Sequence, residues 1–319
     1  MAFLTGTGAS LQIGKESSFA LAVAPSALVD LTSESIKFSV EKGDEGSLLG
    51  SKTAMNRDIL SASVEGSVSF ILRPECAGLL LHAAMGGADL CEQVASSDFY
   101  THTMGLCDVN ESLPSLTVIV DRKAAVKRYA GCTISAFSLE CAAGDYVKGS
   151  IDIKGTHEES GSLNASVSRF SHRPYRCTSA TFTIAGLTYD ISSASIKIDN
   201  ALEIAPRTYA SGLYAGRPQH GRRSVTINFE IPYSTEVESL KSTYLTAEEG
   251  AAVTLSFSSP TPGYGISITV PHVAIGEVDA NVSGTGILSS TISGEALSVG
   301  TEEPITVVIT DTTTTAYGG

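Results

Sequence analysis

The sequence predicts a mainly β protein with two tandem β-sandwich or barrel domains, each with one short flanking α-helix and one long loop between strands. Polar and apolar residues alternate over many short segments, as they do in half-buried strands. Glycine contributes 30 of the 319 residues, and this composition favours turns over long helices. The phrase SESIKF at 33–38 returns as SASIKI at 193–198, which indicates that the chain repeats one unit.

The first half is expected to contain a strand at 31–40, where apolar residues occupy alternate positions. Residues 41–60 mix charge with glycine and are expected to form a long loop, which makes them a functional candidate. A second strand at 61–72 ends at Pro74, and 75–87 is expected to form a short amphipathic helix ended by glycines. Further strands are expected at 100–104, 115–121, 129–141 and 146–155.

The second half is expected to repeat this order. A strand at 193–199 leads into a glycine- and charge-bearing loop at 200–223, and a strand at 224–232 precedes an amphipathic helix at 234–245. Further strands are expected at 252–258, 264–278, 287–294 and 304–311.

The repeated order predicts the domain boundaries. The first domain is expected at 1–160, the second at 181–319, and the polar, turn-rich segment 161–180 is expected to link them. The strand before each helix suggests a residue-level match. The expected counterparts are Val225 for Val68, Ile227 for Phe70 and Phe229 for Leu72.

The chain is acidic, with a formal net charge of −13 from 21 basic and 34 acidic residues. No Lys or Arg follows Lys241, so the last 78 residues carry −8. Such a surface repels phosphate, which argues against tight electrostatic binding of DNA. The same acidity would also serve simply to keep the protein in solution.

The first residues, MAFLTGTGASLQIGKE, have no basic region and no long apolar run, so no secretory signal is expected. No stretch approaches the ~20 apolar residues that cross a membrane, so no membrane contact is expected. We therefore expect synthesis in the cytoplasm, where the six cysteines stay reduced and act as buried thiols.

Motifs of catalysis are absent from the sequence. It contains no nucleophile elbow, zinc-protease motif, phosphate-binding loop or dinucleotide fingerprint, and its six histidines are scattered. Adjacent Glu158 and Glu159 lie in a polar segment and are better explained as solvated carboxylates than as an acid and base pair. We expect no enzyme activity, no cofactor and no metal site.

Two basic clusters could carry a binding role. Arg122, Lys123, Lys127 and Arg128 flank a turn between two predicted strands, and Arg217, Arg222 and Arg223 lie in the second long loop. They could contact an acidic surface of a neighbouring copy. They could equally be a solvated turn and loop.

One family resemblance covers the first half in order. The segments GKESSFALA, LTSESIKF, SVEGSVSFILRPECAGLLLHAAMG, YTHTM, LPSLTVIVDR, YAGCTISAFSLEC and GSIDIKG resemble the tail tube proteins of long-tailed bacteriophages. The match runs over residues 14–158. The second half keeps the order of elements but has a different amino-acid sequence. Both domains are therefore expected to be tail-tube-like.

The resemblance implies a structural virion protein. Such proteins join edge to edge into rings of six domains, and the rings stack into a hollow tube around a tape-measure protein and later conduct DNA without binding it specifically. A duplicated chain would complete a ring as a homotrimer, although a hexamer that uses one half remains open. Tail terminator and tail-tip or baseplate proteins are further implied partners. The implied location is the virion tail, after assembly in the host cytoplasm.

The resemblance also implies that the two long loops make the contacts between rings. The residues expected there are Asp44, Glu45, Lys52, Arg57 and Asp58 in the first loop and Arg207, Tyr209, Tyr214, Arg217, Arg222 and Arg223 in the second. The alternative function is a two-domain adhesin or receptor-binding module. Tyr209 and Tyr214 are its candidate binding aromatics.

Overall fold

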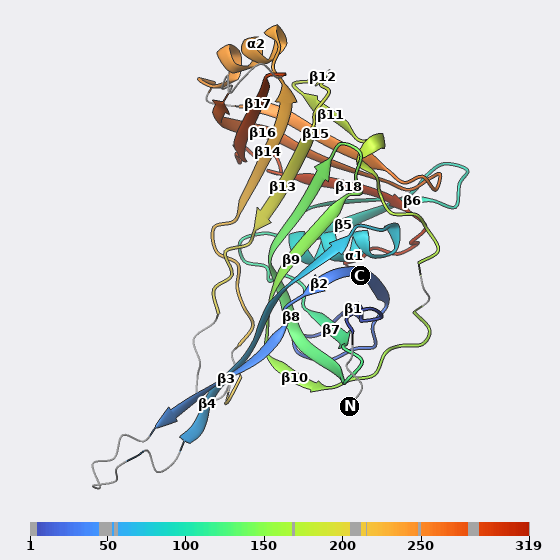
Figure 1. Cartoon of the computed structure of the whole chain (residues 1–319), viewed down its shortest axis with the longest axis vertical. Helices are drawn as coiled ribbons and strands as arrows, with labels where there is room; N and C mark the ends of the chain where they lie inside the picture. The colour runs from blue at the N-terminus through green and yellow to red at the C-terminus, as the bar shows by residue number, and fades with distance from the viewer. Residues whose placement is uncertain are drawn as a thin grey trace.

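The fold is mainly β, as the sequence predicts. The computed structural model describes residues 5–44, 53, 57–167, 170–204, 212–214, 216–247, 250–279 and 287–318. Within these ranges 18 strands form one hydrogen-bonded network, and there are two α-helices. Figure 1 shows the molecule along its long axis, with an arm of two strands at one end, α2 at the other and α1 between them.

The described part of the first half supplies ten strands and α1 (Pro74–Met85). The strands are β1 (Ser10–Lys15), β2 (Ala27–Glu34), β3 (Lys37–Asp44), β4 (Arg57–Ile71), β5 (Gly86–Gln93), β6 (Tyr100–Leu106), β7 (Leu116–Asp121), β8 (Val126–Ala142), β9 (Lys148–Gly155) and β10 (His157–Ser160).

The described part of the second half supplies eight strands, α2 (Thr235–Tyr244) and a 3₁₀ turn at Cys177–Ser179. The strands are β11 (Thr181–Ile184), β12 (Leu187–Thr188), β13 (Ser193–Asp199), β14 (Ser224–Pro232), β15 (Ala251–Ser258), β16 (Gly265–Asp279), β17 (Ser289–Ala296) and β18 (Thr306–Asp311).

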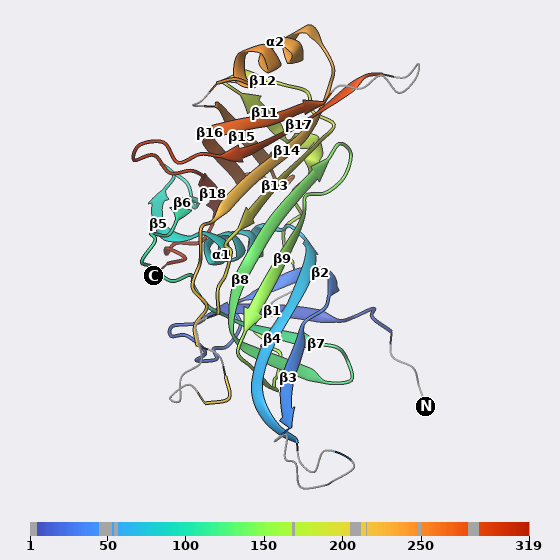
Figure 2. The same ribbon diagram turned by 90° about the vertical axis from the view of Figure 1, so that its left-hand side faces the viewer.

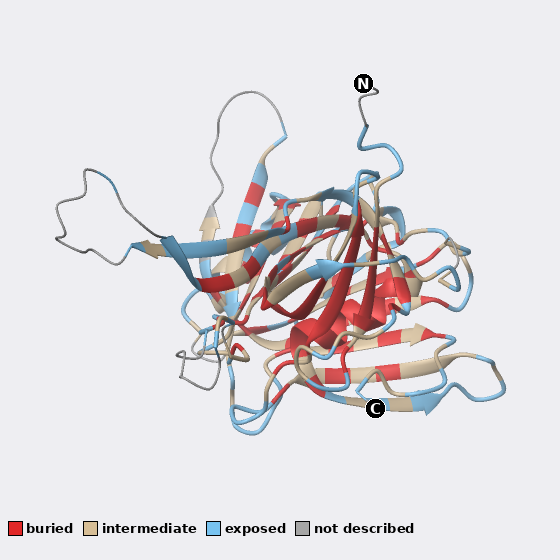
Figure 3. Ribbon diagram, turned by 90° about the horizontal axis from the view of Figure 1, so that it is seen from below, coloured by how far each residue is buried: buried red, intermediate tan, exposed pale blue. Residues whose placement is uncertain are grey.

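Helix α1 lies inside the sheet layers, as its buried colour in Figure 3 shows. Pro74 occupies its first turn, and Gly86 ends it with φ at 75°, a conformation that glycine adopts without strain. Every residue of the helix except Glu75 is buried. The expectation of an amphipathic helix is therefore wrong for α1, because the strands of the first half and the chain's C-terminal tail cover it on several sides.

Helix α2 is amphipathic, as the sequence predicts. Only Val237 and Leu240 of its residues are buried, so it covers the sheet with one face. Ser234 caps its N-terminus, because the hydroxyl oxygen accepts a hydrogen bond of 3.4 Å from the backbone N–H of Val237.

The two halves contain corresponding strand pairings. All of these pairings are antiparallel. In the first half they are β1–β2, β1–β7, β3–β4, β4–β9, β7–β8, β8–β9 and β8–β10; in the second they are β11–β12, β11–β15, β13–β14, β14–β17, β15–β16, β16–β17 and β16–β18.

Irregularities in the strands also correspond. The register of β8 against β9 shifts between Ile134 and Ala136, and that of β16 against β17 shifts between Ile275 and Glu277. A bulge adds one residue to one strand and so gives a position along it. The bulges therefore align the two halves independently of their sequences.

This alignment corrects one correspondence that the sequence suggested. Val68 corresponds to Phe229, because they lie opposite Ile151 and Ile292. The expected match of Val68 with Val225 is therefore wrong by four residues. An even shift keeps apolar side chains on the same face, so alternation alone could not detect the error. By contrast, the structural alignment matches SESIKF at 33–38 with SASIKI at 193–198, as the sequence suggested.

The halves share one sheet and one core. β13 pairs antiparallel with β8, from Ser193 opposite Ala142 to Asp199 opposite Ala136, and we call this pairing the internal seam. β18 of the second half also pairs with β6 of the first. Figure 2 shows β9, β8, β13 and β14 side by side. One hydrophobic cluster runs from Leu11 to Ile309, so the described parts of both halves pack as one body.

The expected linker 161–180 packs on the first half where the structure describes it. Tyr175 has no exposed surface, and its backbone N–H donates to the carbonyl of Leu72 over 3.1 Å. The backbone N–H of Val147 donates to the carbonyl of Tyr175 over 3.0 Å. The segment connects the halves along a docked path.

The predicted loop 41–60 begins later and ends earlier than expected. β3 continues to Asp44 and β4 begins at Arg57, and these two residues are register partners. The strands form the arm that leaves the body in Figure 1. The sequence did not predict this pairing, because both faces of the arm are exposed and its residues therefore do not alternate between polar and apolar.

Candidate assembly interfaces

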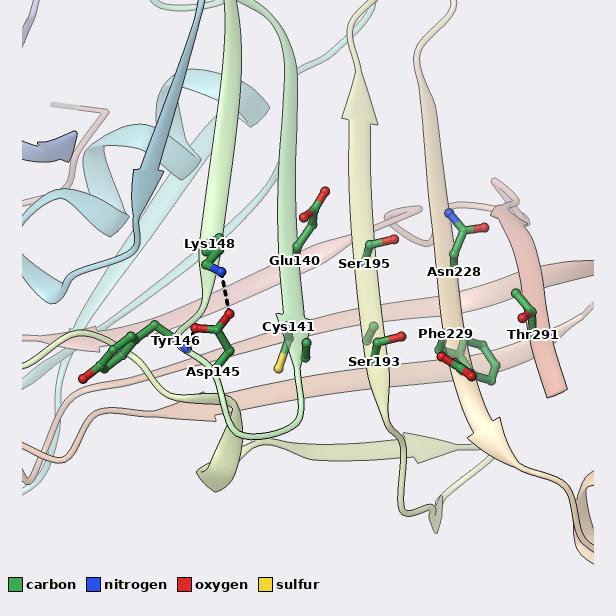
Figure 4. Close-up of a pocket in the computed structure, with 13 residues that line it drawn as sticks. Glu140, Cys141, Asp145, Tyr146, Lys148, Ser193, Ser195, Asn228, Phe229 and Thr291 are labelled. Atoms are coloured by element: carbon green, nitrogen blue, oxygen red, sulfur yellow. Dashed lines mark hydrogen bonds and ion pairs between the residues drawn. The ribbon is translucent and has the colours of Figure 1, made fainter. Parts of the chain in front are cut away.

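The sheet around the internal seam has one buried face and one polar face. Buried side chains such as Phe137, Ile196 and Phe229 pack on the core side. A row of Lys148, Glu140, Ser195 and Asn228 crosses β9, β8, β13 and β14 on the other side (Figure 4). Alternation along each strand produces this division.

The polar face is rich in carboxylates and hydroxyls. We define it as the outward positions of β4, β9, β8, β13, β14 and β17. Its hydroxyls include Ser67, Ser138, Ser150, Ser195, Thr226, Thr291 and Ser293, its acids are Glu65, Glu140, Asp152, Asp199, Glu230 and Glu295, and its lysines are Lys148, Lys154 and Lys197. Such a surface is hydrated and disfavours phosphate.

A cavity of about 350 Å³ lies over this face. Lys148 and Asp145 form an ion pair at its edge (Figure 4), and the hydrogen bond from Lys148 lowers the pKa of Asp145. The thiol of Cys141 is buried, and its pKa is raised by its hydrogen bond with Cys177 and by burial. These groups do not form a nucleophile with an adjacent base.

The basic turn between β7 and β8 is engaged within the chain. Arg122 binds the Glu34 carboxylate with two hydrogen bonds of 2.8 Å and donates to the carbonyl of Ile36 over 2.6 Å. The hydrogen bond from Arg122 lowers the pKa of Glu34. Arg122 therefore fixes the junction between β2 and β3.

The other three basic residues of this turn have acidic partners as well. Lys123 pairs with Asp121 at 2.8 Å, Lys127 pairs with Glu158 at 2.6 Å, and Arg128 pairs with Glu159. Glu158 and Glu159 are thus the partners of a basic turn. A contact of this turn with a neighbouring copy remains a prediction.

The second long loop folds back on the first half where it is described. Arg217 donates to the carbonyl of Leu113 over 2.7 Å, and Arg223 donates to the backbone carbonyls of Met85 and Cys107. Arg222 is exposed. These contacts anchor the loop. A role of Arg217, Arg222 and Arg223 between rings stays a prediction.

Tyr214 also packs within the chain. It forms a backbone bridge with Ala62 of β4, and its ring centroid lies 5.4 Å from that of His157. The side chain remains 39% exposed. Arg207 and Tyr209, the other predicted residues of this loop, lie outside the described residues.

The arm carries three of the five predicted residues of the first loop. Asp44, Arg57 and Asp58 are exposed at its tip. Glu45 and Lys52 lie outside the described residues. Exposed apolar side chains accompany the charges, namely Val40, Ile59 and Leu60. This mixture suits contact with another protein surface.

A buried polar cluster joins the halves, and we call it the His102 cluster. Nδ1 of His102 lies 2.8 Å from Asp89, and Nε2 lies 3.4 Å from Asp311 and 3.0 Å from the carbonyl of Thr313. The Tyr317 hydroxyl donates to Asp311 over 2.6 Å. The sequence carried no signal for this cluster, because its members lie up to 228 positions apart.

Neither a metal centre nor a membrane helix emerges from the described ranges. No three His, Cys, Asp or Glu side chains converge there in an arrangement that could hold a metal ion. Neither helix in these ranges has the length and apolar character needed to cross a bilayer.

Comparison with known proteins gives a family match. The model of the phage tail tube protein family matches residues 6–310, which is nearly the whole chain. A search of curated proteins finds no match. The family match includes both halves and the internal seam.

Proposed function

Because this chain belongs to the phage tail tube protein family, we propose that it forms rings that stack into the hollow tail tube. The family makes it a structural protein of the virion tail. In the proposal three copies form each ring, and the rings surround a tape-measure protein and conduct DNA at ejection. The chain has no catalytic role in this assembly.

The internal seam is the observation that carries this proposal. Two halves with corresponding strand pairings are already joined edge to edge through β8 and β13. We infer that 1–160 and 181–319 are copies of one ancestral domain, and that each supplies one sector of the ring. Six sectors then need three chains, as the family resemblance implies.

The polar face supports the role of conduit. The opposite face is occupied by α1 and the core, so the polar face is the one left to line a channel. Its carboxylates repel the phosphates of passing DNA, and its hydroxyls hold water at the wall. DNA could then slide through without sticking.

The arm supports stacking. It extends the sheet beyond the body and ends in exposed charged and apolar side chains, so it can reach a neighbouring ring. Tail terminator and tail-tip or baseplate proteins would occupy the same surfaces at the two ends of the tube. Assembly would take place in the host cytoplasm.

Negative-stain microscopy of the purified chain tests the proposal. We expect annular particles, and a particle mass of three times 33.1 kDa for a single ring. A chain that stays monomeric at high concentration and at all ionic strengths, even when it is co-expressed with tape-measure and tail-tip proteins, would overturn it. A glycan-array hit without polymerisation would support the adhesin alternative instead.

The conduit role has a separate test. Assembled tubes should not retain DNA on a filter at about 0.15 M salt. Tubes that carry Glu140→Lys and Glu230→Lys should retain it, because both changes place positive charge on the polar face. Equal retention by both tubes would place this face away from the channel.

A further inference from the structure

Among the described strands, β3 and the end of β16 each have an open edge at the positions that correspond to the internal seam. β3 pairs with β4 along one edge, and its other edge is open between Lys37 and Val40. β15 covers one edge of β16 as far as Val273, and that edge then continues open to Asp279, while β17 covers the opposite edge. An open edge presents a row of N–H and C=O groups to a further strand.

The corresponding edges are paired with each other inside the chain. SASIKI of β13 lies 160 positions after SESIKF (193 − 33), and the bulge at Ile275 of β16 lies 141 positions after that at Ile134 of β8 (275 − 134). β13 thus corresponds to β3, and β8 corresponds to β16. The internal seam is therefore an example of the joint that the two open edges could make.

We propose that β3 of one copy pairs antiparallel with residues 276–279 of β16 in the next copy, in the register of the internal seam. Lys197 lies opposite Ser138 in that seam, and Ile198 lies opposite Phe137. Subtraction of 160 from the β13 numbers and addition of 141 to the β8 numbers give the proposed partners. Lys37 then lies opposite Asp279, and Phe38 lies opposite Val278. This inference rests on the proposed function and names the surface through which the ring closes.

The edge of β3 is already held in place in the single chain. Glu34 accepts a hydrogen bond of 2.9 Å from the backbone N–H of Ile36, and Arg122 binds the same carboxylate and the Ile36 carbonyl. Gly66 permits the close approach of this junction, because a Cβ there would lie 2.5 Å from Cα of Ile36. An edge fixed in advance loses little conformational entropy on pairing.

The backbone of β3 presents a donor at the right position. Val40 is the register partner of Ala62, whose N–H donates away from β3 to Leu213 over 3.1 Å. In a non-hydrogen-bonded antiparallel pair both N–H groups point outward, so the N–H of Val40 faces the open edge. Asn200 is the counterpart of Val40 in the second half. Its backbone N–H donates to the backbone carbonyl of Ser135 in β8 over 2.9 Å.

The register follows from side-chain alternation. Phe38 packs against the core cluster, as its counterpart Ile198 does. A slip of one residue would turn the apolar side chains of the paired strands toward the polar face. Each copy offers one β3 edge and one β16 edge, so the contact is heterologous and a closed ring uses up both of these edges.

Cysteine pairs test the register. Lys37→Cys with Asp279→Cys places two thiols at a non-hydrogen-bonded pair, where the separation of the Cα atoms suits a disulfide. Under mild oxidation we expect covalent species of two and three chains. Lys197→Cys with Ser138→Cys should link within one chain. Lys37→Cys with Glu277→Cys shifts the register by two residues and should link at least about tenfold less.

The outcomes separate the two proposals. Annular particles that link through the shifted pair, or through neither pair, would overturn this register and leave the tube function standing. A wild-type chain that forms no annular particles and no links would overturn both. Each single-cysteine variant controls for links through the native thiols.

A proline variant gives a second test that needs no cross-link. Val40→Pro removes the N–H at the open edge and keeps the hydrogen bonds of β3 to β4. We expect it to abolish ring closure and to leave the unfolding midpoint of the single chain unchanged. Val40→Thr keeps the N–H and should assemble. Rings of Val40→Pro with wild-type yield would overturn the proposal.

Discussion

Nδ1 of His102 lies 2.8 Å from Oδ2 of Asp89, and neither side chain is exposed to solvent. His102 belongs to β6 and Asp89 to β5, a hairpin that has no counterpart among the described strands of the second half. The same imidazole reaches Asp311 at the end of β18. One histidine thus connects an element of the first half to the terminal strand of the second.

Replacement of this histidine should weaken the whole fold. His102→Leu would leave Asp89 and Asp311 buried without the imidazole. Loss of one member of a buried pair typically costs about 3–5 kcal/mol. Urea unfolding followed by circular dichroism measures the change. His272→Gln at the more exposed pair with Glu302 is the matched control and should cost less than about 1 kcal/mol. Equal effects of the two variants would contradict this reading.

Gly78 should respond to alanine in opposite directions in two backgrounds. A Cβ at Gly78 would lie 2.1 Å from Cζ of Tyr317, and that ring is held by hydrogen bonds to Asp311 and Thr313. Gly78→Ala should therefore destabilise the wild-type chain. In a Tyr317→Ala background the same change should stabilise it by about 1 kcal/mol, the usual gain of alanine over glycine in a helix. The free energies of unfolding of the four chains form the test, and the same sign in both backgrounds would refute it.

The pair of Arg122 with Glu34 should make stability depend on acidity. The hydrogen bond from Arg122 holds the folded-state pKa of Glu34 below its ordinary value of 4.5. Its contribution is therefore fully present above pH 4.5 and is lost as the pH falls through the folded-state pKa. Glu34→Gln should cost about 1–3 kcal/mol at pH 7, and this difference from wild type should shrink below pH 4.5. A difference that stays constant to pH 3 would argue against it.

Removal of the arm's tip should separate folding from stacking. Deletion of residues 44–58 takes away the loop and the last pairs of β3 with β4, all of which lie outside the core. We expect a folded chain with a wild-type far-ultraviolet spectrum that forms single rings and no stacked tubes in electron micrographs. Loss of the fold would show that the tip is needed for folding.

Much of the fold could be predicted from alternation, which is strong wherever one face of a strand is buried. The strands at 146–155 and 224–232 alternate in this way and correspond to β9 and β14. The short strands β1 and β5 were missed. β1 is buried along most of its length and so has no alternation. β5 belongs to a hairpin with β6, and this hairpin joins the sheet through the pairing of β6 with β18.

The candidate interfaces were predicted only in part. Charge and glycine content indicated the arm, but the ends of its strands could not be predicted, because neither face is covered. The sequence likewise gave no sign that Arg217 and Arg223 bond to the first half or that Tyr317 returns to α1. Such contacts join residues more than 100 positions apart, and no local pattern records them.

The seam between β8 and β13 changes the molecularity of the assembly that we propose. When neighbouring sectors are tethered on one polypeptide, their joint forms at a fixed effective concentration and does not depend on dilution. Each ring then forms from three chains and not from six separate domains. Fewer translational and rotational degrees of freedom are therefore lost per ring. The yield of closed particles should thus fall less steeply on dilution than for an unfused relative. The two sectors of one chain are also free to diverge, so threefold features could mark a channel of sixfold outline.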